Sequence, residues 1–207
     1  MERFRLFPLG GIAFVILVLV PKLAFGGGGP DTDASAADVL SYYDGHIGRE
    51  NVLVFVFAAA VPCLVVFGVG LASLTSGTAA WRRVLVAGTT LVAGTMLVSA
   101  VTRFALVEAV DQGVRGDAIR ALNTFDNEVW VAWNGALGVM MIGAGAVLLG
   151  ARLLPRWLSR LAIVLGVLLY VPAADFVALM VSIVWILGVS IVLALRAPAA
   201  VQPALVT

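Results

Sequence analysis

The chain has 207 residues, of which 62% are hydrophobic and 12% are charged, whereas soluble domains carry roughly 45–50% apolar and 25% charged residues. This composition excludes a water-soluble fold, because a soluble domain of this length could not bury so much apolar surface. The net charge of +1 does not indicate a nucleic-acid partner, and the single cysteine, Cys63, excludes an intramolecular disulfide.

Six hydrophobic segments are predicted to cross the membrane as helices of an all-α bundle with two short outer amphipathic helices. A spanning helix needs about 20 apolar residues bounded by charge, Gly or Pro. Together the segments form a single transmembrane domain, 1–207. They cover residues 7–25, 52–74, 84–104, 129–149, 158–172 and 176–196.

The first predicted span, 7–25, also resembles a signal peptide because Arg3 and Arg5 precede it. Its end, Ala24-Phe25-Gly26, is a poor cleavage site, so we expect the helix to be retained. Lys22 near that end can extend its ammonium group to the outer interface.

The first outer segment, 26–51, begins with four glycines that indicate a hinge. The spacing of apolar residues in 34–44 then predicts a short amphipathic helix lying on the membrane or on the other helices. His46 is the only histidine, which excludes bis-histidine haem ligation and a histidine-based zinc site within one chain. No metal or cofactor is predicted, although a bound lipid is compatible with the composition.

Within the third and fourth spans the polar residues are small. Gly, Ser and Thr let membrane helices approach closely, so helix packing is the first interpretation of Thr95 and Ser99 and of the glycines after Asn134. The functional alternative is that Asn134 contacts a ligand. Met140, Met141 and Trp185 are possible borders of a cleft for a lipid, quinone or pigment.

The second outer segment, 105–128, is predicted to contain another short amphipathic helix, since Ile119 and Leu122 form one apolar face around 117–122. Asp126 and Glu128 stand at the start of the fourth span. Acids there complement the exposed amides and the dipole of the helix.

The last apolar stretch, 161–195, would be about 50 Å long as one helix, far more than a bilayer requires. Pro172 disfavours helix at Val171 and removes a hydrogen bond, and Asp175 can cap the next helix. The stretch is therefore predicted to divide into the spans 158–172 and 176–196.

When successive hydrophilic segments are placed on alternate sides of the membrane, the basic residues concentrate on one side and nearly all acidic residues fall on the other. One side has the residues Arg3, Arg5, Arg82, Arg83, Arg152, Arg156, Arg160 and Arg196. The other has Lys22, Arg49, Arg103, Arg115 and Arg120 together with every acid except Glu2. The positive-inside rule places the first side, with both termini, in the cytoplasm of a bacterial cell.

Six polar residues fall near the outer ends of the predicted helices, and their convergence into a polar pocket or cation site is the functional hypothesis for them. Helix capping and solvation are the alternative. These candidates are His46, Arg49, Arg103, Asp126, Glu128 and Asp175.

Three stretches, 30–46, 154–160 and 185–196, resemble a broad set of uncharacterised actinobacterial multi-span membrane proteins. The first reads PDTDASAADVLSYYDGH and the second LPRWLSR. The resemblance implies a multi-pass protein of the bacterial plasma membrane. The set has no assigned activity to carry over to particular residues.

Few ionisable groups lie within the spans, which favours a non-enzymatic role as an accessory or assembly subunit or as a lipid-phase binding protein. The partners would be membrane lipids, another membrane protein or a second copy of the chain. A small oligomeric transporter or channel is the first alternative, and it predicts that Asn134, Thr95 and Ser99 face a common cavity.

The second alternative is a membrane enzyme with an outward-facing polar site. It predicts that Asp126, Glu128, Asp175 and His46 converge within hydrogen-bond reach, about 3 Å directly.

Overall fold

The computed structural model describes residues 7–25, 29–74, 79–152 and 154–196. Arg3, Arg5 and most of the predicted glycine hinge lie outside these residues. Throughout the described part the chain is all-helical, as predicted, and five of its helices are long and apolar enough to cross a membrane. The helices are α1 Phe7–Phe25, α2 Ala36–Asp44, α3 Ile47–Ala72, α4 Ala79–Asp111, α5 Asp117–Ala151, α6 Arg156–Leu168 and α7 Asp175–Leu195.

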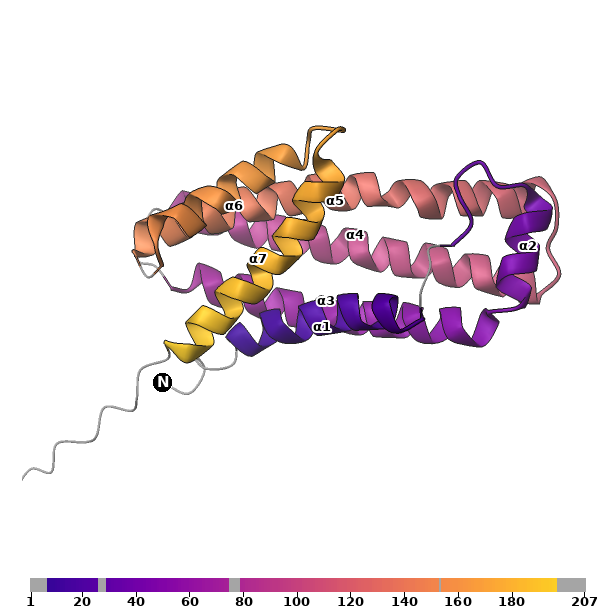
Figure 1. Ribbon diagram of the computed structural model, residues 1–207, viewed down its shortest axis with the longest axis horizontal. Coiled ribbons are helices and arrows are strands. Elements are labelled where there is room, and N and C mark those ends of the chain that lie inside the picture. The colour runs from indigo at the N-terminus through magenta and orange to yellow at the C-terminus, as the bar shows by residue number, and fades with distance from the viewer. Residues whose placement is uncertain (1–6, 26–28, 75–78, 153, 197–207) are drawn as a thin grey trace, which may run out of the picture.

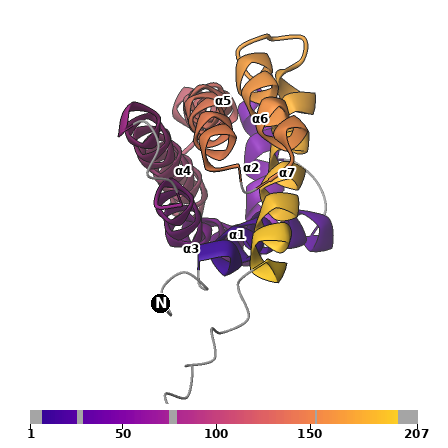
Figure 2. The same ribbon diagram turned by 90° about the vertical axis from the view of Figure 1, so that its left-hand side faces the viewer.

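The long helices and α6 form a ring in chain order. Each of α1, α3, α4, α5, α6 and α7 packs on the next, and α7 returns to α1 to close the ring (Figure 2). Side chains from several helices fill the centre. The fully or almost fully buried residues there include Phe14, Leu64, Met96, Met140 and Ile186.

The two ends of the bundle differ. At one end α2 lies across the ends of α3, α4 and α5 (Figure 1), and we call this the capped end; it contains residues 29–46 and 105–128. The start of α1 and the end of α7 lie together at the opposite end, which we call the terminal end. Because both described ends of the chain share this side, Arg196 lies on the same side as the start of α1, as the charge pattern predicts.

The capped end has a small core of its own. Val39 and Tyr43 of α2 pack with Leu106 of α4 and Ile119 of α5, and all four are fully buried. The short outer helix predicted in 34–44 is therefore α2. Its apolar side packs on the other helices.

The second predicted outer helix is not separate, and this corrects the sequence analysis. Residues 117–128 are the first turns of α5, which continues without interruption to Ala151. No Pro or Gly occurs between Asp117 and Asn134 to end the helix. Packing of Ile119 on α4 stabilises these first turns of α5. From composition alone the polar first turns and the following apolar span look like two separate segments.

The fifth predicted span, 158–172, is also corrected. Helix α6 ends at Leu168, so its 13 residues extend about 20 Å, whereas the hydrocarbon core is about 30 Å thick. The chain turns between α6 and α7 where Pro172 predicts a break, and α7 matches the sixth predicted span closely. The Tyr170 hydroxyl donates to the Gly135 carbonyl at 2.6 Å and holds this turn against the middle of α5.

Glycines allow the closest helix contacts, as the sequence predicts. A Cβ atom at Gly88 of α4 would lie 2.6 Å from the Met140 Cα of α5, and one at Gly143 would lie 2.7 Å from the Leu85 nitrogen. These separations are shorter than real Cβ contacts, so the backbones of α4 and α5 could not approach as they do with larger residues.

Helix α2 begins with a capping interaction that can be tested. The Asp38 backbone nitrogen donates to Ser35 Oγ at 3.2 Å, and Ser35 Oγ donates to the Asp38 carboxylate at 2.6 Å. We expect Ser35→Ala to cost about 1 kcal/mol of local stability, which is roughly a fivefold loss of hydrogen-exchange protection in α2. Ser41→Ala, at an exposed position on the same helix, is the control. If the backbone amides of α2 exchanged at the same rate in both variants, the capping role of Ser35 would be contradicted.

Candidate functional site

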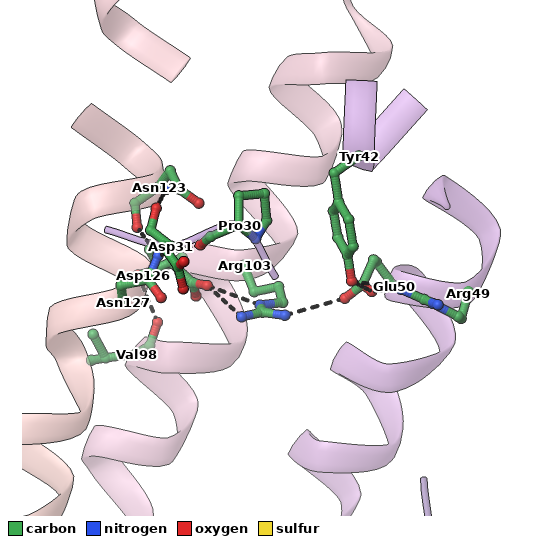
Figure 3. A network of polar contacts seen from close by, with 11 residues as sticks. Pro30, Asp31, Tyr42, Arg49, Glu50, Val98, Arg103, Asn123, Asp126 and Asn127 are labelled. Atoms are coloured by element: carbon green, nitrogen blue, oxygen red, sulfur yellow. Dashed lines mark hydrogen bonds and ion pairs between the residues drawn. The ribbon is translucent and has the colours of Figure 1, made fainter. Parts of the chain in front are cut away.

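A network of ionised side chains joins three helices at the capped end. The Arg103 guanidinium of α4 lies between two carboxylates (Figure 3). It donates to Asp126 of α5 at 2.6 and 2.9 Å and to Glu50 of α3 at 3.2 Å. The side chains of Glu50 and Asp126 are only 1% and 2% exposed. Both buried acids therefore depend on Arg103.

Glu50 has two further partners. Arg49 donates to Glu50 Oε1 at 2.9 Å, and the Tyr42 hydroxyl of α2 donates to the same oxygen at 3.1 Å. Burial, followed by the charge of Glu50, raises the pKa of the Tyr42 phenol, so this group stays protonated near neutral pH. The polar network, Tyr42, Arg49, Glu50, Arg103 and Asp126, thus contains two cations and two anions.

This balance indicates what the polar network does. Buried charges are tolerated when each is paired and hydrogen-bonded. Every ionised group here has a partner within the network, so no charge remains to attract a substrate or metal ion. The network locks α3, α4 and α5 together at the capped end.

The segment after α1 covers the network. Asn123 and Asn127 of α5 donate to the backbone carbonyls of Asp31 and Pro30, at 2.9 and 3.1 Å. The Tyr43 ring is fully buried below this segment, and burial raises the pKa of its phenol. Specific amide contacts therefore hold a predicted loop in place.

A second feature lies on the side of the bundle, between α1, α5 and α7. This lateral recess has a volume of about 220 Å³. It is lined by Val18, Leu19, Lys22, Trp130, Trp133, Phe176, Leu179, Met180 and Ile183. Its floor is buried, since Val18 is 3% and Ile183 2% exposed, while Phe176 at its edge is 65% exposed. The recess therefore opens on the membrane-facing side of the helices.

The start of α7 lies at the level of the recess. Asn134 of α5 donates to the Asp175 carboxylate at the start of α7, with a separation of 3.5 Å. Asn134 is eight residues beyond Asp126, or about 12 Å further along α5 from the polar network. Helix α7 thus starts well below the capped end, and the recess lies beside its first turns, where these face α1 and α5.

Two polar groups of the recess lack a partner. Lys22 makes no hydrogen bond or ion pair with any residue that the structure describes. The Trp133 Nε1 donor is buried without an acceptor. In contrast, Trp185 Nε1 donates to the Leu158 carbonyl at 2.9 Å. Buried donors usually find an acceptor, and the Trp133 indole is one of several buried groups of the described chain that do not.

The structure brings together three of the six predicted outer residues, namely Arg49, Arg103 and Asp126. His46 lies beside them: its Nδ1 is 2.6 Å from the Tyr42 carbonyl oxygen, and its ring packs on that of Tyr42.

Two predicted outer residues lie elsewhere. Glu128 lines a shallow surface hollow with Asp117, Arg120 and Phe125. Asp175 lies at the α6–α7 turn beside Asn134. Across the described residues, no hydrogen bond or ion pair joins any two of Asp126, Glu128, Asp175 and His46.

The predicted intramembrane polar residues do not line either of the two hollows described above. Thr95 donates to the Val92 carbonyl of its own helix at 3.0 Å. Ser99 is half-buried on α4, and Asn134 is buried with its Oδ1 unpartnered. Met140, Met141 and Trp185, the possible cleft borders, are buried in the core.

Sequence reasoning missed Glu50, Tyr42 and the lateral recess. A signal for Glu50 existed: an acid in the first turn of one span is adjacent to Arg103 at the end of the next when the two helices are antiparallel. The recess had no such signal, because its apolar lining residues resemble any lipid-facing side chains.

Among the described residues, no group of three or more His, Cys, Asp or Glu side chains is placed to hold a metal ion. Comparison of the chain with protein families, with curated proteins and with solved structures finds no match. The geometry of the lateral recess and of the polar network therefore carries the functional conclusion.

Proposed function

We propose that the chain is a non-enzymatic membrane protein that binds a lipid in the lateral recess. The observation that carries this proposal is a hollow with an apolar floor between α1, α5 and α7. The floor residue Ile183 is buried and the edge residue Phe176 is exposed. This arrangement is expected of a site that a lipid enters sideways from the membrane.

The size of the recess favours a hydrocarbon chain. Pockets for drug-sized ligands usually measure about 300–1,000 Å³, and this one is smaller, at about 220 Å³. It can hold part of an amphiphile while the remainder stays among the surrounding lipids. Lys22 is the only charged lining residue, so most of the contact would be apolar.

We further propose that the capped end faces outward from a bacterial plasma membrane and that both termini are cytoplasmic. Arginines at the terminal end support this orientation through the positive-inside rule. Within the described residues these are Arg82, Arg83, Arg152, Arg156, Arg160 and Arg196.

The other hypotheses receive less support from the geometry. A transporter would use Asn134, Thr95 and Ser99 around a common cavity, but these residues line neither described hollow. An outward-facing enzyme would need free acids near His46, whereas Asp126 is paired with Arg103.

Photo-crosslinking tests the proposal. The protein would be reconstituted in vesicles containing a lipid with a diazirine in its acyl chain, and the adducts located by mass spectrometry. We expect adducts on Val18, Leu179 and Ile183, which are at most 6% exposed and are out of reach of bulk lipid. Adducts confined to exposed positions such as Val101 of α4 would contradict the proposal.

A matched pair of variants sharpens this test. Leu19→Trp adds bulk inside the recess and should reduce its adducts several-fold. Leu23→Trp makes the same change one turn further along α1, where the side chain is 80% exposed, and should leave the adducts unchanged. An equal effect of both variants would show that the labelling does not depend on the recess.

A further inference from the structure

We infer that the preferred occupant of the recess is an anionic phospholipid whose phosphate group binds Lys22. This inference rests on the proposed lipid-binding function and adds the class of headgroup to it. It is carried by Lys22, the charged residue of the lining, and by the direction of the recess along the bundle.

The charge of Lys22 is left over after the neighbouring groups have paired. Lys22 is close enough to Arg103 and Asp126 for their charges to act on it. Asp126 is already bound by Arg103, and Glu50 by Arg103 and Arg49. Among the residues that line the recess, Lys22 is the only charged one, so its ammonium group is the charge there that can attract a headgroup.

The polar and apolar parts of the recess are ordered along the bundle. Lys22 is in the last turn of α1, near the capped end, and Val18 lies one turn further from that end. On α7, Ile183 is seven residues beyond Phe176, or about 10 Å deeper in the bundle. The cation therefore lies on the headgroup side and the apolar floor on the midplane side, which is the orientation of a lipid in that leaflet.

Trp133 contributes an aromatic surface to the wall of the recess. Its Nε1 group is buried and has no acceptor, and its ring is held edge-on against Phe57 of α3 at 5.9 Å between centroids. Apart from Lys22 and the indoles of Trp130 and Trp133, the lining residues have apolar side chains.

Apolar contact alone gives little selectivity, because lipid tails are as apolar as the side chains that would replace them. The headgroup interaction therefore decides which lipid is enriched. A basic side chain near a membrane surface contributes about 1 kcal/mol toward anionic lipids, which corresponds to roughly a fivefold preference. Phosphatidylcholine also has a phosphate, but its own cation neutralises it.

The experiment compares two diazirine lipids with identical acyl chains, one with a phosphatidylglycerol and the other with a phosphatidylcholine headgroup. Adducts on Leu179 and Ile183 are normalised to those on Val101, which is 67% exposed and samples bulk lipid. We expect the phosphatidylglycerol lipid to give about five times more recess adducts. Lys22→Gln should bring the ratio close to one, and Lys22→Arg should preserve it.

Arg115→Gln is the matched control. It removes one positive charge from the exposed loop between α4 and α5, at the same end of the bundle but away from the recess, and should leave the ratio unchanged. A decrease as large as that of Lys22→Gln would overturn the assignment to Lys22 in favour of general surface attraction.

The two proposals fail differently. Recess adducts in equal amounts from both lipids would overturn the headgroup inference and leave lipid binding intact. No recess adducts from either lipid would overturn lipid binding itself.

Discussion

Replacing Arg103 with Met is expected to lower the free energy of unfolding by about 3–5 kcal/mol. The substitution leaves the buried carboxylates of Glu50 and Asp126 without their shared cation, and α3, α4 and α5 lose their common contact at the capped end. Denaturant titration in micelles, followed by the loss of helical circular dichroism, measures the change. Arg120→Met, at an exposed position on α5, should stay within about 0.5 kcal/mol of the wild type.

A compensated variant distinguishes charge burial from a general packing effect. With Arg103→Met, the additional changes Glu50→Gln and Asp126→Asn remove both unpaired charges and keep the side-chain volumes similar. Most of the lost stability should return, because neutral amides cost far less to bury than carboxylates. If the triple variant is as unstable as Arg103→Met alone, the ionic account of the polar network is wrong.

Two glycines of α4 should respond to the same substitution with opposite signs. Gly88→Ala is expected to destabilise the protein by about 1–3 kcal/mol, because the new methyl group would overlap the Met140 backbone of α5. Gly94→Ala meets nothing within 4 Å and should stabilise the helix by about 0.5–1 kcal/mol through its better helix propensity. The same denaturant titration measures both variants.

The comparison is informative because both positions lie on one membrane helix and differ only in their surroundings. A destabilising Gly94→Ala would mean that this face of α4 packs against something outside the described chain, such as a second copy. A neutral Gly88→Ala would mean that α4 and α5 can separate without loss, against the close contact observed.

Much of the architecture follows from residue types in order along the chain. Segment length and polarity predict α1, α3, α4, α5 and α7, since each must cover the hydrocarbon core with apolar side chains. The break near Pro172 and the amphipathic α2 were also predicted, because proline chemistry and apolar spacing are local. Local rules could not predict that α5 begins at Asp117, since packing on α4 stabilises those polar turns.

The candidate site was only partly predictable. Polar residues near helix ends pointed to Arg49, Arg103 and Asp126, which do meet. Glu128 is one turn or less from Asp126 in sequence but lies on another face of α5, a difference that only the orientation of the helix decides. Glu50 belongs to the site because α4 runs antiparallel to α3 and so places Arg103 beside it.

The sequence by itself determined that this chain is a membrane bundle, where its long helices lie and how its charges divide between the two ends. These properties depend on transferring each segment into lipid, and that free energy is a sum over neighbouring residues. Only the tertiary structure decided which charges pair and that a recess remains beside Lys22. The pairing depends on how α3, α4 and α5 pack side by side, and the recess depends on how α7 packs between α1 and α5; contacts between segments distant in sequence set both.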